Sequence, residues 1–152
     1  MQERARALWA TTTLHVWPEP FRLVSLPLSA LREAAAFVAE TGEAFSCLIK
    51  ERDEVSLTVA AASWQGSPLR RSARGDQGPF RLITFDLDLD LAVTGYLAPA
   101  AEALAAAGVP IVPQCAFLKD HVLVPADRLE TAVLALERVI LLAKEVAPAS
   151  CP

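Results

Sequence analysis

Carboxylates on alternate residues are the feature of this sequence that most strongly suggests chemistry. Asp86, Asp88 and Asp90 alternate with leucines in the run FDLDLDL, residues 85–91. Two aspartates at this spacing after an apolar strand could act as nucleophile and general acid in phosphoryl transfer. The residue two after Asp88 is another aspartate, however, and too little chain follows for a catalytic domain of that type. The run therefore does not predict such an enzyme.

The same carboxylates do not fit a calcium loop either. If Asp86 were the first ligand, Leu91 would stand where the loop needs glycine and Leu97 where it needs a bidentate glutamate. The strict alternation instead predicts a half-buried strand over residues 80–91, with its aspartates on the solvent face. Asp90 lies nearest the end of that strand and could face a ligand.

The remaining reactive side chains form no recognisable catalytic or metal-binding set. The histidines, His15 and His121, stand at no triad spacing, and the cysteines lack a CxxC arrangement. Cys47 and Cys115 fall in apolar strand candidates, where small buried thiols are ordinary. No phosphate-binding glycine motif or nucleophile elbow occurs, and the chain has only 6 glycines. We expect no catalytic residue, no metal and no cofactor.

A backbone site is the better candidate, at residues 90–98, where a predicted strand leads into a predicted helix. Free N–H groups and the positive end of the helix dipole would gather at that helix start and suit a carboxylate. Gly95 would let a ligand approach the backbone closely. An ordinary strand–helix turn capped by Thr94 explains the segment equally well.

Composition limits the class of protein. Hydrophobic residues make up 53% of the 152 and charged residues 21%, so a folded core is expected. The net charge of −4 argues against nucleic acid as a partner, and prolines interrupt the most apolar stretch, residues 97–118, which argues against a membrane span. Three cysteines without a signal peptide favour reduced thiols and a cytoplasmic protein.

Periodicity predicts two halves with the same order of elements. Residues 10–65 are predicted to contain β-α-β-β and residues 80–144 β-α-β-β-α. Residues 66–79, rich in Gly, Pro and Arg, are predicted to be a linker with a solvated basic cluster, and residues 145–152 a flexible tail. The second half lacks one strand of a ferredoxin-like βαββαβ fold. We expect residues 10–17 to supply it from the N-terminus, which would intertwine the halves.

The second half also resembles the ACT domain. Thr94-Gly95-Tyr96-Leu97, Ala107-Gly108-Val109-Pro110-Ile111 and Lys119-Asp120-His121-Val122-Leu123-Val124 match, in order and spacing, the family's helix start, its entry into a strand and its turn before the next strand. The pattern is similar to tandem-ACT proteins related to aspartokinase regulatory domains and to the CASTOR arginine sensors. The resemblance implies an α+β, ferredoxin-like fold with antiparallel sheets and helices on one face.

The resemblance further implies a regulatory or sensor protein, not an enzyme, that binds an amino acid. The implied ligand-binding residues are Asp90, Val93, Thr94, Gly95, Tyr96, Cys115, Phe117 and Asp120, with Ala116 beside them. Asp120 would face the ligand side chain and, through its charge, would favour arginine or lysine. A homodimer is expected, with an unidentified protein partner receiving the signal. The alternative is an interaction or dimerisation protein that has lost ligand binding, with Tyr96 filling the pocket.

Overall fold

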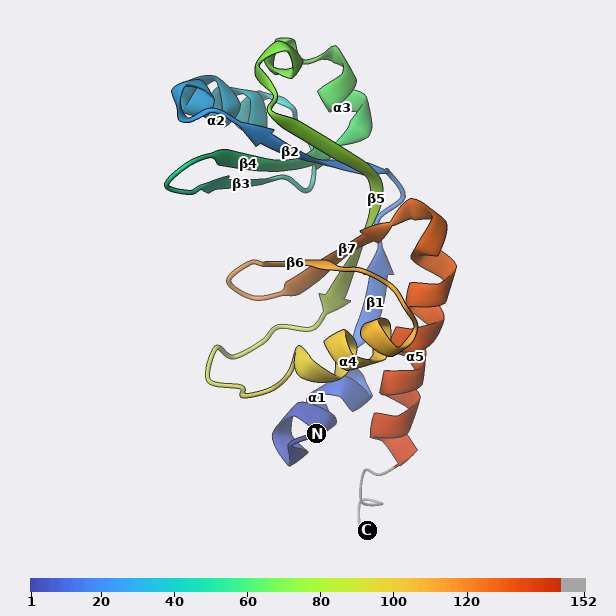
Figure 1. Cartoon of the computed structure of the whole chain (residues 1–152). Coiled ribbons are helices and arrows are strands. Elements are labelled where there is room, and N and C mark those ends of the chain that lie inside the picture. The colour runs from blue at the N-terminus through green and yellow to red at the C-terminus, as the bar shows by residue number, and fades with distance from the viewer. Residues whose placement is uncertain (146–152) are drawn as a thin grey trace. The chain divides into compact units, whose positions relative to one another are not determined.

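The computed structural model describes residues 1–145, which form two compact units (Figure 1). The continuous unit is Pro18–Arg81. The discontinuous unit combines Met1–Trp17 with the chain from Leu82 onward. The long strand β5 (Gly75–Asp86) passes from the first to the second, so each unit uses one part of it.

The discontinuous unit is a four-stranded antiparallel sheet with helices. Its strands are β1 (Thr13–Val16), the end of β5, β6 (Val112–Cys115) and β7 (Asp120–Pro125), in the order β1-β5-β7-β6. Its helices are α1 (Glu3–Thr11), α4 (Ala98–Ala106) and α5 (Leu129–Glu145), which follows the short 3-10 turn η3 (Ala126–Arg128). Both α1 and α4 contact α5.

Buried apolar side chains join these elements into one core. Trp9 of α1 packs with Phe85 of β5, Leu104 of α4 and Leu136 of α5, all fully buried. In α5 the buried positions Ala132, Leu136, Val139, Ile140 and Ala143 recur at helical spacing, as expected for an amphipathic helix.

The continuous unit has the same strand arrangement. It contains β2 (Phe21–Leu26), η1 (Leu28–Ala30), α2 (Leu31–Glu40), β3 (Cys47–Lys50), β4 (Val55–Ala60), α3 (Ala61–Gly66), η2 (Pro68–Ser72) and the start of β5. Its order is β3-β4-β2-β5, all antiparallel. Val24, Leu57, Trp64 and Leu69 are among its core residues.

The predicted ferredoxin-like α+β class is confirmed, and so is the origin of the missing strand. β1 pairs with β5 from Thr13 opposite Asp86 to Val16 opposite Ile83. The strand is shorter than the predicted residues 10–17, because Ala10 and Thr11 belong to α1. β1 thus covers one edge of β5 that would otherwise expose unpaired backbone groups.

Two sequence predictions are wrong. The segment 66–79 is not a linker: it forms η2 and the start of β5, and buried Leu69 anchors it. The predicted strand 80–91 begins earlier and ends at Asp86, where Leu87 N–H turns back to donate to the Phe85 carbonyl at 2.9 Å. Of the predicted tail, Glu145 ends α5, and residues 146–152 lie outside the described part. No helix within residues 1–145 is long and apolar enough to cross a membrane.

Candidate functional site

A pocket of about 280 Å³ opens in the discontinuous unit between two loops. One wall is the segment from the end of β5 into α4, and the other is the turn between β6 and β7. The residues that line it are Leu89, Asp90, Leu91, Val93, Gly95, Tyr96, Leu97, Ala98, Ala116, Phe117, Leu118, Lys119 and Asp120.

The structure brings six of the eight predicted site residues together in this pocket. They are Asp90, Val93, Gly95, Tyr96, Phe117 and Asp120. Ala116 also lines it. Thr94 and Cys115 do not, although each is adjacent in sequence to a lining residue.

Hydrogen bonds fix the loop that forms the first wall. Asp90 accepts a hydrogen bond from Ala92 N–H at 2.9 Å and one from Arg4 at 2.7 Å. These bonds hold the pKa of Asp90 below its usual value, the Ala92 bond most strongly. The N–H of Leu89 donates to the Leu118 carbonyl at 2.8 Å, so the two walls are directly joined.

Two of the alternating aspartates also help to join the two walls of the pocket. Lys119, in the β6–β7 turn, forms a close ion pair with Asp86 and lies 3.4 Å from Asp88. The bond to Asp86 is the main reason that the pKa of Lys119 is raised. Two of the three alternating aspartates therefore hold the turn that lines the pocket and are not themselves lining residues.

The start of α4 offers backbone groups to the pocket. Leu97 is its N-cap residue and no described side chain caps it, so the alternative of a turn capped by Thr94 is not what forms. Gly95 has φ +78°, a left-handed conformation that favours glycine, and an added Cβ there would meet nothing within 4 Å. The helix start and the glycine before it are thus open to a small molecule.

Tyr96 faces the core, and α1 holds it. Its ring stacks on Trp9 with centroids 5.0 Å apart, and its hydroxyl lies 2.8 Å from the Thr12 hydroxyl. Burial raises the pKa of Tyr96 to about 12. Sequence reasoning missed Arg4, Trp9 and Thr12, because nothing in residues 1–13 indicates contact with a loop 80 or more residues away.

Asp120 is the pocket carboxylate without a cationic partner among the described residues. The ion pairs there use Asp86, Asp88 and Asp90 from this region but not Asp120. Asp120 accepts a hydrogen bond from the Cys115 thiol, which together with burial raises the pKa of Cys115 to about 11. A raised thiol pKa makes Cys115 a poor nucleophile at neutral pH.

The pocket rim carries exposed apolar side chains. Leu91 is 76% exposed, Phe117 78% and Leu118 47%. No group of three or more His, Cys, Asp or Glu residues within positions 1–145 could hold a metal ion. The arrangement can therefore bind a small molecule through backbone groups, one carboxylate and apolar contacts.

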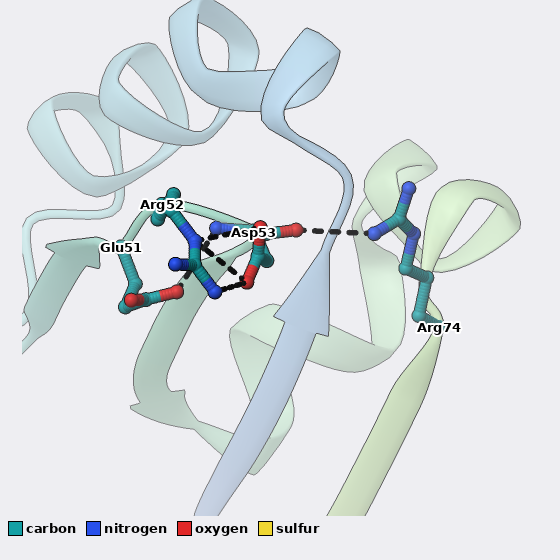
Figure 2. Close-up of polar contacts among 4 residues, drawn as sticks. All are labelled: Glu51, Arg52, Asp53 and Arg74. Carbon is teal, nitrogen blue, oxygen red and sulfur yellow. Dashed lines mark hydrogen bonds and ion pairs between the residues drawn. The ribbon is translucent and has the colours of Figure 1, made fainter.

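The corresponding turn of the continuous unit is closed on itself (Figure 2). Between β3 and β4, Asp53 N–H donates to Glu51 at 2.9 Å and Arg52 donates to the Asp53 carboxylate at 2.8 Å. Arg74 donates to the Asp53 carbonyl at 3.2 Å. The charged side chains of this turn are therefore bound to one another, and Arg74 binds its backbone.

Comparison with family models finds one similarity, over part of the chain. The family described as "ACT domain" matches residues 77–138, which include both walls of the pocket. No curated protein matches the chain.

Solved structures share the fold over most of the chain. A protein of unknown function from Vibrio cholerae, described as a possible transport protein, is 18% identical, with TM-score 0.70 over 89% of this chain and 94% of that one. A protein from Agrobacterium tumefaciens is 20% identical, with TM-score 0.66 over 85% and 89%. The regulatory subunit of aspartate kinase from Thermus flavus is 17% identical, with TM-score 0.62 over 84% and 97%.

Proposed function

We propose that this protein is a regulatory module that binds an amino acid in the pocket between the β5–α4 loop and the β6–β7 turn. The observation that carries the proposal is one cavity whose two walls offer groups of opposite polarity, backbone N–H groups and a carboxylate. The uncapped start of α4 and Gly95 lie on one wall. The carboxylate of Asp120, which has no cationic partner among the described residues, lies on the other. An amino acid carries a carboxylate and an ammonium group that match these two walls.

The lining residues also limit the size and chemistry of the ligand. A volume of about 280 Å³ suits a small metabolite and not a large cofactor. Asp120 would pair with the ligand's ammonium group or with a cationic side chain, as in arginine or lysine. Leu89, Val93 and Phe117 would cover the aliphatic part of the ligand.

A binding role without catalysis agrees with the side chains present. Lys119 is bound to Asp86 and Asp88, Asp90 is bound to Arg4, and the thiol of Cys115 is held protonated. No general base and nucleophile therefore face each other across the pocket. The matching strand orders of the two units support a tandem-ACT arrangement of the kind found in the CASTOR sensors, and a cytoplasmic location is consistent with the free thiols.

Calorimetry with each of the twenty amino acids tests the proposal. We expect saturable binding of one or a few of them, cationic ones first, and a loss of affinity of roughly tenfold or more in Asp120→Asn. Asp127→Asn is the matched control, because Asp127 is exposed in the same unit and does not line the pocket. Absence of binding by all twenty would refute the proposal.

A second function, self-association, is favoured by a separate surface. On α5, Leu134, Leu141 and Leu142 are 66%, 58% and 50% exposed. Leu134 and Leu142 line grooves that share Ala103 and Val139 between α4 and α5. We call this surface the α4–α5 face.

The occupant that we propose for the α4–α5 face is a second copy of the chain. Glu102 lines one of the two grooves and Arg138 the other. In a two-fold dimer each contact occurs twice, so Glu102 of each copy can meet Arg138 of the other. If amino-acid binding fails while this dimer forms, the protein is an ACT-fold interaction module.

A further inference from the structure

The continuous unit contains a basic surface that amino-acid binding does not use. Three arginines lie within five residues, Arg70, Arg71 and Arg74, and all are exposed. The sequence alone suggested a solvated linker here, whereas the structure shows a built turn.

The turn is held at several points. Ser67 accepts a hydrogen bond from Leu69 N–H at 3.3 Å at the start of η2, and Leu69 itself is buried. After η2, Arg74 N–H donates to the Ser25 carbonyl of β2 at 2.8 Å. The backbone that carries the arginines is therefore fixed before any ligand arrives, which lowers the entropic cost of binding.

One carboxylate, Asp76, lies beside the three arginines of this turn and interacts electrostatically with Arg70. Asp76 is already bound by Arg22 at 2.7 Å and by the Trp64 indole N–H at 3.0 Å, so it offsets only part of the charge of three arginines. Among the ion pairs within residues 1–145, none uses Arg70, Arg71 or Arg74.

Two of these arginines donate to backbone carbonyls. Arg70 donates to Gln65 at 3.3 Å and Arg74 to Asp53 at 3.2 Å, the latter visible in Figure 2. A carbonyl carries no net charge and each of these bonds uses one of five N–H donors, so each guanidinium keeps its positive charge and further donors.

Two adjoining hollows lie at these guanidinium groups. One, of about 410 Å³, is lined by Arg70, Arg71 and Arg74 with Ala73, Gly75 and Asp76. The other, of about 340 Å³, shares Arg70 and Asp76 and adds Arg22, Ala61, Trp64, Gln65 and Pro79. The first is thus strongly cationic, and the second is mixed polar and apolar.

We propose that this pair of hollows binds a small organic phosphate, with the phosphate group among Arg70, Arg71 and Arg74 and the organic part beside Trp64 and Gln65. Guanidinium groups match the several oxygens of a phosphate through paired N–H···O bonds, and three of them offset its double charge. A single carboxylate would leave most of these donors unused. The adjoining hollow explains how an organic group would be accommodated.

Titration with ribose 5-phosphate, followed by calorimetry and by NMR shifts of backbone amides in residues 64–76, tests this site. We expect binding that is stronger than that of inorganic phosphate, weakens with added salt, and falls roughly tenfold or more in Arg70→Ala/Arg71→Ala. Arg32→Ala is the control, because it removes an exposed arginine of the same unit that lines neither hollow and should leave binding unchanged.

A second arm distinguishes a free phosphate from a lipid headgroup. Vesicles containing phosphatidic acid are compared with neutral phosphatidylcholine vesicles in a sedimentation assay. Sedimentation with the acidic vesicles alone, lost in the double variant, would assign the phosphate to a lipid. If neither ribose 5-phosphate nor the acidic vesicles bind, or if binding persists in the double variant, the proposal is wrong. Neither result affects the amino-acid pocket, which lies in the other unit.

Discussion

The indole N–H of Trp9 donates to the carbonyl oxygen of Tyr96 at 2.7 Å, while the two rings stack 13° from parallel. Both residues are buried. One residue belongs to the N-terminal helix and the other to the loop that lines the candidate pocket. The helix therefore fixes the backbone of the binding loop from its core side.

Replacement of Trp9 by Phe should disturb both stability and the pocket. The change leaves the buried Tyr96 carbonyl without its donor and creates a cavity, for a cost of about 2–4 kcal/mol in the free energy of unfolding. Denaturant unfolding and ligand calorimetry measure the two effects. Trp64→Phe removes a comparable indole bond, to Asp76, in the other unit and should lower stability without changing amino-acid affinity. Equal affinity losses in both variants would contradict the role of Trp9.

Ionisation of Tyr96 should limit stability at alkaline pH. The Thr12 hydroxyl donates to the Leu8 carbonyl at 2.9 Å, so it must accept from the Tyr96 hydroxyl, which stays protonated. The folded pKa of about 12 exceeds the ordinary value of 10. The stability that Tyr96 contributes through this raised pKa is therefore fully present below about pH 10 and declines as the pH rises towards 12.

Absorbance of tyrosinate measures this directly, because the chain has a single tyrosine. We expect its midpoint well above 10 in the folded protein and near 10 in denaturant. In Tyr96→Phe the tyrosine-linked part of the alkaline decline should disappear. A folded-state midpoint of 10 would show that the hydroxyl is not held as described.

Gly95→Ala should separate backbone strain from loss of binding. Its φ of +78° costs an alanine about 1–2 kcal/mol, and the new methyl group would project into open space at the pocket. Gly42→Ala is a closely matched control, because φ of Gly42 is +63° and nothing lies within 4 Å of the added Cβ. Gly42 belongs to the continuous unit, whereas the pocket lies in the discontinuous unit. Both variants should lose similar stability, measured by denaturant unfolding, but only Gly95→Ala should weaken amino-acid binding.

Protonation of His121 should destabilise the fold at mildly acidic pH. Trp17 donates to the Thr84 hydroxyl at 2.8 Å, and that hydroxyl lies 2.8 Å from Nδ1 of His121 and can donate to it. Burial, the largest cause, lowers the pKa of His121 below 6.5. The neutral form is thus favoured in the fold, and stability present above about pH 6.5 is lost as the pH falls through the folded pKa.

Denaturant unfolding between pH 5 and pH 7.5 tests this prediction. His121→Gln keeps an acceptor for Thr84 and should reduce the acid-side slope, whereas His15→Gln should retain it. An unchanged slope in His121→Gln would assign the effect to other groups.

The α4–α5 face should control oligomeric state. Light scattering over a range of concentrations should show a dimer, and Leu134→Glu/Leu142→Glu should shift it to monomer because it places charges in an apolar contact. Glu102→Arg should weaken the dimer, and Glu102→Arg/Arg138→Glu should restore it. A dimer that is unaffected by these changes would place the interface elsewhere, and a monomer at all concentrations would exclude it.

Most of the strand and helix order was predictable because those elements carry a local signal, but α1 and α3 were not predicted. The buried spacing of α5 and the apolar runs of β4 and β7 appear directly in the sequence. Six of the eight predicted site residues share one pocket because they all lie at loop ends that the ferredoxin-like topology brings together. The covering of β5 by an N-terminal strand followed from the count of strands.

The errors arose where long-range contacts override local pattern. Residues 85–91 alternate like a strand, but β5 ends at Asp86 and a loop follows. Lys119 binds Asp86 at the end of the strand and Asp88 in that loop. Residues 66–79 have the composition of a linker, yet buried Leu69 and the pairing of β5 with β2 give them fixed structure. Contacts of α1 with Tyr96 have no local signal at all.

The pairing of β1 with β5 also has a consequence for synthesis on the ribosome. Thr13 and Asp86 are paired although 73 residues separate them. At about 5–20 residues per second, β1 must wait roughly 4–15 seconds for its partner to be translated, while the whole continuous unit emerges in between. During that interval Trp9 and β1 lack their native partners in β5 and the Tyr96 loop, which exposes this segment to misfolding.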